Sequence, residues 1–366
     1  MKRKIRMTKL NELIDKYCPN GVEYKELRDL ACYANKKIDS AELDKNTYVS
    51  VENLLQNKQG KTYANSLPTS AKVVKFEIGD ILIGNIRPYL KKIWLSDCIG
   101  GTNGDVLVVQ IKNQAEIIPE FLYYVLSSDL FFAYDVQNSH GAKMPRGSKE
   151  AVMKYRLPVP PLEVQREIVH ILDSFTLLTA ELTARKKQYE FYRDELLTFD
   201  TDVKIEPLGK VCELQAGKAI KAFLISEEKT PMTLIPCYGA NGLRGYVNDY
   251  NQEGDKSVIG RQGALCGNVC YATGKYYATE HAVVVTDKGY FNSRYLFHAL
   301  THADLNQYKT AGAQPGLSVS RLNEVKIAVP NRNVQDKIAN VLDNFESICT
   351  DLNIGLPAEI EARQKQ

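Results

Sequence analysis

Residues Pro160–Phe199 read PPLEVQREIVHILDSFTLLTAELTARKKQYEFYRDELLTF. Apolar or aromatic residues recur along them in alternating steps of four and three, and Arg185 is the only break in the series. The positions are Val164, Ile168, Ile171, Phe175, Leu178, Leu182, Arg185, Tyr189, Tyr192, Leu196 and Phe199. This is the spacing of a coiled-coil seam over about five heptads. A helix from Leu162 to Phe199 would be about 57 Å long, more than a small globular domain needs, so we expect it to act as a spacer.

The beginning of this stretch occurs a second time near the end of the chain. Eight residues of the first copy have identical counterparts in the same order and at the same spacing in the second. Val159, Pro160, Val164, Gln165, Ile168, Leu172, Asp173 and Phe175 match Val329, Pro330, Val334, Gln335, Ile338, Leu342, Asp343 and Phe345. The sequence therefore predicts an internal duplication.

The second copy is shorter than the first. Ala184, Arg185, Lys187 and Gln188 match Ala362, Arg363, Lys365 and Gln366 after a shift created by an insert around Gly355. The first copy then continues from Tyr189 to Phe199, whereas the sequence stops at Gln366. By this internal template we predict that the second long helix ends early.

The segments LPVPPLEVQREIVHILDSF and ARKKQYEFYRDELLTF resemble the specificity subunit of type I restriction and modification systems. The resemblance covers nearly the whole chain and depends mainly on the two copies of the pattern VP-x-x-x-VQ-x-x-I. It implies an α+β fold in which two target-recognition domains of mixed α/β structure are separated by long coiled-coil helices. It also implies that methyltransferase subunits dock around those helices.

The duplication extends to the domains themselves. Val22 and Leu27 match Val203 and Leu208 at the domain starts, and FLYYVLSS from Phe121 matches YLFHALTH from Tyr295. The middle parts of the two domains share little, as two readers of different targets would need and as divergence by drift would also produce. We predict an N-terminal leader at 1–19, a first target-recognition domain at 20–153 and the central long helix at 154–200. A second target-recognition domain at 201–324 and the second long helix at 325–366 follow.

The composition is that of a soluble globular protein long enough for two domains, with 44% apolar and 25% charged residues. A net charge of +3 is low for a nucleic-acid-binding protein, so any positive charge used for DNA must be concentrated locally. Eight scattered cysteines and no signal peptide predict reduced thiols, and no run approaches the roughly 18 apolar residues of a membrane span. We expect a cytoplasmic protein.

Candidate DNA-binding residues lie in the turns and Gly-rich segments of both domains. Arg and Lys suit guanine and phosphate, and Asn and Gln suit adenine. In the first domain the predicted residues are Asn85, Arg87, Tyr89, Lys91, Lys92, Asn103, Lys143 and Arg146. In the second they are Arg261, Gln262, Asn268, His281, Gln314 and Ser318. The alternative is that these residues form solvated turns and linkers that need glycine only for their geometry.

Motifs for catalysis were sought in the sequence. A DNA adenine methyltransferase needs an Asn/Asp-Pro-Pro-aromatic motif, but the only adjacent prolines are Pro160 and Pro161 at the start of the long helix. The Gly217–Lys218 pair lacks the flanking residues of a phosphate loop. Four candidate zinc ligands, Cys266, Cys270, His298 and His302, have no CxxC spacing. We therefore predict a non-catalytic chain without a metal or cofactor of its own.

The resemblance also implies the partners: double-stranded DNA, methyltransferase subunits that bind S-adenosylmethionine, and restriction subunits. The aromatic end of the first helix has more apolar surface than one partner helix can cover. We predict that Arg185, Tyr189, Tyr192 and Phe199 face a methyltransferase subunit, and packing within this chain is the alternative. The short second helix favours a homodimer of the truncated chain.

Two other functions stay open at this point. One is a stand-alone DNA methyltransferase or nuclease, which the missing motifs disfavour. The other is a DNA-binding regulator that works without modification partners.

Overall fold

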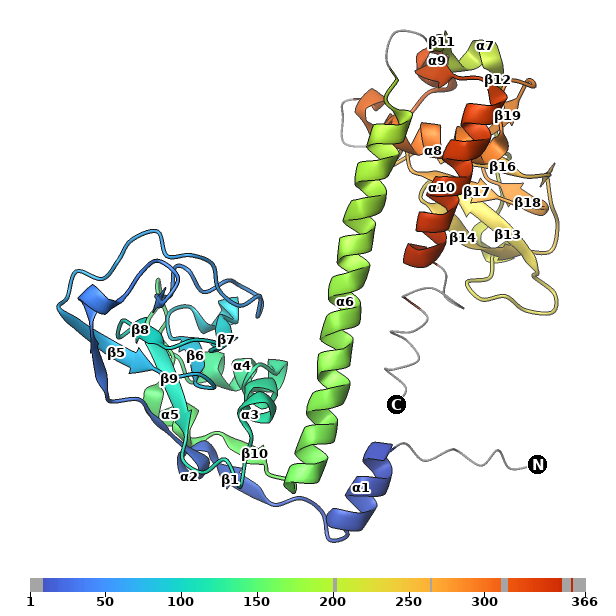
Figure 1. Ribbon diagram of the computed structural model, residues 1–366. Helices are drawn as coiled ribbons and strands as arrows, with labels where there is room; N and C mark the ends of the chain where they lie inside the picture. The colour runs from blue at the N-terminus through green and yellow to red at the C-terminus, as the bar shows by residue number, and fades with distance from the viewer. Residues whose placement is uncertain (1–8, 200–202, 264, 311–314, 351–356, 358–366) are drawn as a thin grey trace. The chain divides into compact units, whose positions relative to one another are not determined.

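The computed structural model describes residues 9–199, 203–263, 265–310, 315–350 and 357 (Figure 1). They form two compact units, and the division between them falls inside helix α6, between Leu177 and Leu178. Within the described ranges, no helix is both long enough and apolar enough to cross a membrane.

The first unit has three groups of paired strands. A central sheet has the order β2-β9-β6-β7, a second sheet the order β3-β5-β8-β4, and β1 pairs with β10. The strands are β1 (Tyr24–Glu26), β2 (Ala31–Tyr33), β3 (Lys37–Asp39), β4 (Tyr48–Val49), β5 (Lys72–Phe76), β6 (Ile81–Gly84), β7 (Ile93–Leu95), β8 (Gly100–Thr102), β9 (Val106–Ile111) and β10 (Arg156–Pro158). The helices are α1 (Lys9–Tyr17), α2 (Leu27–Leu30), η1 (Ser40–Glu42), η2 (Pro88–Leu90), α3 (Pro119–Leu126), α4 (Asp129–Gln137), α5 (Lys149–Lys154) and the start of α6 (Leu162–Leu197).

The second unit repeats this plan. Its central sheet has the order β12-β19-β16-β17, and β11 pairs with β20 as β1 pairs with β10. The strands are β11 (Lys204–Pro207), β12 (Cys212–Ala216), β13 (Ile235–Gly239), β14 (Gly242–Val247), β15 (Gln252–Glu253), β16 (Lys256–Gly260), β17 (Val269–Ala272), β18 (Lys275–Ala278), β19 (Ala282–Asp287) and β20 (Lys326–Val329). The helices are α7 (Leu208–Val211), η3 (Ala222–Leu224), α8 (Ser293–His302), η4 (Leu305–Tyr308), α9 (Val319–Glu324) and α10 (Arg332–Thr350).

These observations confirm the predicted mixed α/β duplication with a long helix between the copies. The remaining sheet of the second unit has the order β14-β13-β18-β15, and its pairing differs from that of β3-β5-β8-β4 in the first unit. The two copies therefore share the central sheet and the paired strands at the domain ends. They differ in the remaining sheet, to which the dissimilar middle parts of the two sequences contribute.

Strand β6 is apolar throughout because both faces of the sheet are covered. In β6, Ile81 and Ile83 pack toward helices α3 and α4, whereas Leu82 packs toward Phe76 and Trp94. Side chains of a strand alternate between faces, so a strand between two cores needs apolar residues at every position. The same alternation occurs in β19 of the second unit.

A buried glutamine near the start of each long helix, α6 and α10, forms hydrogen bonds with backbone groups of the same unit. Gln165 accepts a hydrogen bond from the backbone N–H of Ile118 (3.0 Å) and donates to the carbonyls of Glu116 and Pro160. Gln335 makes the same three bonds with Asn292, Tyr290 and Pro330. The repeated VQ pattern therefore satisfies three backbone groups at the helix start.

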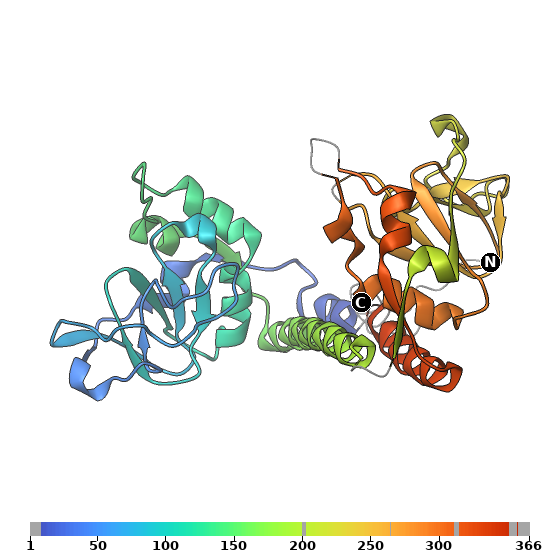
Figure 2. The ribbon, with the colours of Figure 1, turned by 90° about the horizontal axis from the view of Figure 1, so that it is seen from above.

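The second half of α6 packs within the second unit, beside α10 (Figures 1 and 2). The ring of Tyr192 on α6 stacks on that of Phe345 on α10, with centroids 5.3 Å apart. Leu197 near the end of α6 is buried in the core of the second unit.

Candidate nucleic-acid interface

The turn that follows β6 carries the first group of predicted DNA-binding residues. Arg87 and Lys91 flank η2 and both have a left-handed backbone, with φ of 54° and 50°. Residues other than glycine adopt this conformation at a cost, so neighbouring contacts must hold it. Pro88 between them is buried, which anchors the turn, while Arg87 and Tyr89 are exposed.

Backbone hydrogen bonds join this turn to the Gly-rich segment. The N–H of Arg87 donates to the Pro145 carbonyl (2.7 Å), and the N–H of Gly147 donates to the Asn85 carbonyl (3.0 Å). The Arg146 guanidinium pairs with Asp105 at 3.0 Å. Three segments of the sequence therefore form one surface, which we call the first reading surface: residues 85–92, 103–105 and 143–148.

A pocket of about 430 Å³ opens in this surface. Arg87, Lys92 and Asn103 line it together with Glu52 and Met144. The Lys92 ammonium donates to the Val51 carbonyl, and burial lowers the pKa of Lys92. The pocket thus combines cationic, amide and carboxylate groups, the side chains that can bond base edges and phosphates.

Other predicted residues of the first unit have different surroundings. Lys91 pairs with Asp129 on α4 at 2.9 Å, as Lys58 does, and the hydrogen bonds from these two lysines lower the pKa of Asp129 to about 2. Lys143 is exposed. Asn85 is buried beneath the turn rather than exposed on it.

The second unit has an equivalent surface built by the same backbone bonds. We call it the second reading surface: residues 261–263, 280–281 and 315–318. The N–H of Gly263 donates to the Pro315 carbonyl (3.0 Å), and the N–H of Leu317 donates to the Arg261 carbonyl (2.9 Å). The N–H of Arg261 donates to the His281 carbonyl, as that of Asn85 does to Asp105. Arg261 therefore stands at the position of Asn85, and Gly263 at that of Arg87.

The remaining predicted residues of the second unit lie on or beside this surface. Gln262 bridges to Gly316 through the backbone, and the Gly260 N–H donates to the carbonyl of Asn268. Ser318 caps α9 by accepting a hydrogen bond from the Arg321 N–H (3.2 Å). Gln314 lies outside the described residues.

The second reading surface carries a different set of charges. His281 Nε2 lies 3.2 Å from Glu280 Oε1. Arg261 Nε, His281 Nδ1 and Glu280 Oε2 are enclosed and have no hydrogen-bond partner among the described residues. Polar groups in this state keep hydrogen-bonding capacity that a water molecule or another polar group can satisfy.

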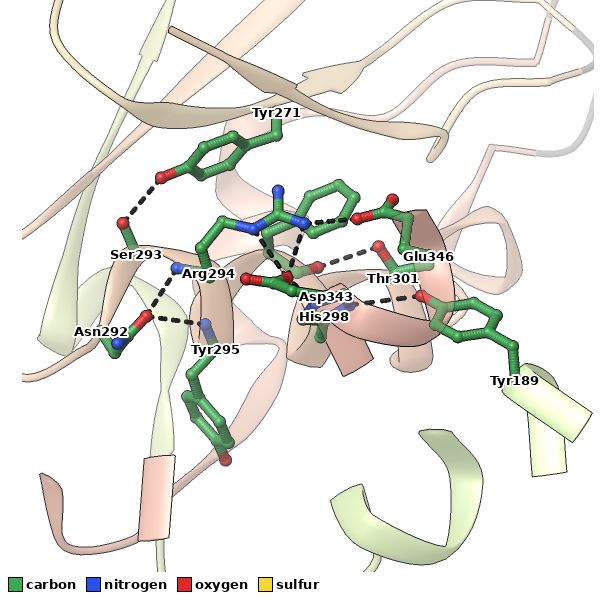
Figure 3. Close-up of polar contacts among 11 residues, drawn as sticks. Tyr189, Tyr271, Asn292, Ser293, Arg294, Tyr295, His298, Thr301, Asp343 and Glu346 are labelled. Carbon is green, nitrogen blue, oxygen red and sulfur yellow. Dashed lines mark hydrogen bonds and ion pairs between the residues drawn. The ribbon is translucent and has the colours of Figure 1, made fainter. Parts of the chain in front are cut away.

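A polar network joins α8 to α10 and α6 in the second unit, and Figure 3 shows it. Asp343 accepts from His298 Nε2 (2.7 Å) and from Arg294 Nε (2.9 Å), and Arg294 also pairs with Glu346. The Tyr189 hydroxyl lies 3.3 Å from His298 Nδ1. Burial lowers the pKa of His298, so the neutral ring can donate to Asp343 and accept from Tyr189.

His298, Asp343 and Glu346 lie close enough to share a metal ion. However, the Arg294 guanidinium already bonds both carboxylates, so a cation would have to displace it. The four candidate zinc ligands considered from sequence have other contacts. His302 pairs with Asp194 at 3.1 Å, and the Cys266 thiol accepts a hydrogen bond from Asn306 Nδ2 at 3.9 Å.

Three of the predicted partner-binding residues have contacts inside the second unit. Tyr189 contacts His298, Tyr192 stacks on Phe345, and Phe199 packs against the core of that unit. Arg185 bonds Gln188 on its own helix. Phe191, which we did not include in that set, is 62% exposed. The heptad spacing already places Phe191 outside the seam that runs through Tyr189 and Tyr192.

Sequence reasoning also missed two buried polar groups. The hydrogen bonds of Gln165 could have been suspected, because the same polar residue occurs in both copies of an apolar pattern. Asp135 on α4 is almost fully buried, and its sequence context, DLFFAYDVQ, gives no indication of this.

Comparison with known proteins gives a consistent family. The family model described as "Type I restriction modification DNA specificity domain" matches residues 19–189 and 201–362. The type I restriction enzyme EcoprrI specificity subunit of Escherichia coli is 47% identical over 206 residues, 53% of this chain and 51% of that protein. A Mycoplasma pneumoniae protein assigned as a type I specificity subunit is 34% identical over 221 residues, 57% of this chain and 88% of that one.

The match to the Escherichia coli protein thus spans about half of that protein's length. Among solved structures, the crystal structure of a type I restriction-modification system S subunit from M. genitalium has a TM-score of 0.68. It is 16% identical and the match covers 94% of each chain, so this likeness concerns the fold. With both halves matched by one family model, the chain belongs to the type I restriction modification DNA specificity domain family.

Proposed function

We propose that this chain is the sequence-specific DNA-recognition subunit of a type I restriction and modification complex. Each unit would read one half of a split target through its reading surface. Family membership favours this function over a stand-alone enzyme or a regulator without modification partners.

One observation carries the proposal. The two reading surfaces are built by the same backbone hydrogen bonds, yet their side chains differ. Where the first has Arg87 and Arg146, the second has Gly263 and Gly316. An identical frame with different donors and acceptors suits two readers of different base sequences.

In this proposal the chain performs no chemistry. Methyltransferase subunits would bind S-adenosylmethionine and methylate adenine, restriction subunits would cleave, and this chain would direct both in the cytoplasm. Helix α6 is continuous from Leu162 to Leu197 and would set the number of base pairs left unread between the two half-sites. Phe191 and Arg185 would contribute to methyltransferase docking.

The test is a binding-site selection from randomised duplex DNA, with the chain co-expressed with its methyltransferase subunit. We expect a split motif with a fixed unread gap. A single contiguous motif, a symmetric motif or no enrichment would contradict the proposal of two different readers.

A single substitution tests the assignment of the first reading surface. We expect Arg87→Ala to lower the preference for one half-site about tenfold, as loss of a specific base contact does, and to leave the other unchanged. Arg28→Ala is the control, because Arg28 is exposed in the same unit and pairs only with nearby Glu26 among the contacts described. Equal losses at both half-sites would argue against a base-reading role for Arg87.

A further inference from the structure

Asp135 is a buried acid without a visible partner. It lies on α4, is 1% exposed, and neither carboxylate oxygen has a hydrogen-bond partner among the described residues. Burial raises the pKa of Asp135 to about 6. A carboxylate in such a place is costly unless a neighbour satisfies it, so the neighbours decide what it does.

Two neighbouring donors are already in use. The Tyr33 hydroxyl donates its proton to the Lys149 carbonyl at 2.9 Å. The Gly147 N–H donates to the backbone carbonyl of Asn85 at 3.0 Å. The side chain of Asn85 is a further neighbour.

The side chains of Asp135 and Asn85 both lie beside the Cα of Gly147. A Cβ atom built on Gly147 would lie 2.5 Å from Asp135 Oδ1 and 2.9 Å from Asn85 Oδ1. Asn85 Oδ1 is also enclosed and has no hydrogen-bond partner in the part of the chain that the structure describes. The two side chains thus face the same small space beside Gly147, within reach of one bridging water or, after either side chain turns, of a direct hydrogen bond. A proton on Asp135 can donate to Asn85 Oδ1, or the amide can turn so that Nδ2 donates to the carboxylate.

Asn85 is the junction of the first reading surface. Its N–H donates to the Asp105 carbonyl, and its carbonyl accepts from Gly147 in the Gly-rich segment. Two residues later, Arg87 begins the left-handed turn. Helix α4 also holds the far end of this turn, where Asp129 pairs with Lys91. Because the Asn85 backbone bonds both other segments of the surface, a contact that holds the Asn85 side chain in place also helps to hold these segments together.

Among the residues of the second unit that the structure describes, we find no counterpart of this pair. Arg261 stands at the position of Asn85. Between α8 and α9, where the first unit has α4, the second has η4 (Leu305–Tyr308), whose residues LNQY include no acid. Any effect of Asp135 on recognition must therefore be confined to one half of the target.

We propose that Asp135 is a positioning residue for DNA recognition by the first unit: it pairs with the Asn85 amide beneath the turn and so fixes how Arg87 and Arg146 are presented. This inference rests on the proposed function. Asp135 itself does not touch DNA, because it is enclosed by the turn, Gly147 and the core of the unit.

The test exchanges the two side chains. Asn85→Asp places two carboxyl groups together, and we expect the preference for the first half-site to fall about tenfold. Adding Asp135→Asn restores one acid and one amide in swapped places, and we expect the preference to return to within about twofold of the original. Glu150→Gln is the control, since Glu150 is exposed on α5 in the same unit.

Each variant is assayed by the selection described above, in the complex with the methyltransferase subunit. Failure of the original chain to select a split motif would overturn the proposed function itself. If the original chain selects one, two results would overturn only the role of Asp135: an unchanged preference in Asn85→Asp, or a double variant no better than Asn85→Asp. Rescue of the first half-site, with the second constant throughout, is the supporting result.

Discussion

Removal of the Asp343 carboxylate should weaken the second unit much more than the equivalent change weakens the first. Asp343 on α10 accepts hydrogen bonds from His298 and Arg294, both on α8. Asp173 holds the same place on α6, but it accepts only the hydroxyl of Tyr124, at 2.6 Å, among the bonds described. Asp343→Ala and Asp173→Ala are therefore a matched pair.

The magnitude follows from burial and the number of donors. Losing one partner of a buried, charged pair costs about 3–5 kcal/mol, and a single hydrogen bond to a charged group contributes about 1.5–3 kcal/mol. The Asp343 side chain is 36% exposed and Arg294 keeps Glu346, so we expect the free energy of unfolding to fall by about 2–3 kcal/mol in Asp343→Ala. Asp173 is exposed, and its loss should cost about 0.5–1 kcal/mol.

The single tryptophan makes the two units distinguishable in one denaturation experiment. Trp94 lies in the first unit, edge-on to Phe76. Its fluorescence reports that unit, whereas far-ultraviolet circular dichroism reports both, and units with separate cores are expected to unfold separately. Asp343→Ala should shift a transition seen only by circular dichroism. Equal shifts in the two variants, or a large shift of the Trp94 transition in Asp343→Ala, would refute this reasoning.

Three further outcomes are expected. Burial lowers the pKa of His298, so the second unit should lose stability as pH falls below about 6.5, the ordinary histidine value. Circular-dichroism denaturation at pH 7.5 and pH 5.5 measures this loss, and His298→Tyr should remove it. Burial raises the pKa of Asp135 to about 6, so its contribution to the stability of the first unit is present at low pH and is lost as pH rises from about 4 to 6. Asp135→Asn should therefore raise the free energy of unfolding, followed by Trp94 fluorescence, by about 2–3 kcal/mol at pH 7.5 and by almost nothing near pH 3.5. Gln165→Leu leaves three backbone groups unpaired and should destabilise that transition by about 3 kcal/mol, whereas exposed Glu163→Gln should not.

The long helix and the duplication could be predicted because both depend on local information. The apolar series from Val164 to Phe199 fixes one helix face, and the observed helix, Leu162–Leu197, ends two residues before the predicted Phe199. The repeated VQ pattern marked both helix starts. Periodicity of this kind needs no knowledge of which distant segments pair.

The second sheet of each unit could not be predicted in the same way. Strands such as β4 (Tyr48–Val49) and β15 (Gln252–Glu253) have two residues, too few for an alternating pattern, and their neighbours are set by non-local pairing. For the same reason the sequence could not separate Asn85, which lies under the turn, from Arg87, which lies on it. Only the contact with the Gly-rich segment makes that distinction.

The two copies differ in an orderly way that follows from what each position must satisfy. Gln165 and Gln335 each bond three backbone groups that are fixed by the fold, so neither copy can replace its glutamine without leaving unpaired donors and acceptors. Asp173 and Asp343 bond side chains instead, and there the partners have changed from Tyr124 to His298 and Arg294. On the reading surfaces the backbone bonds remain and the side chains differ freely. This pattern suits the proposed reader of two unlike half-sites. Only the side chains of the reading surfaces can change which bases are recognised without moving the backbone that presents them.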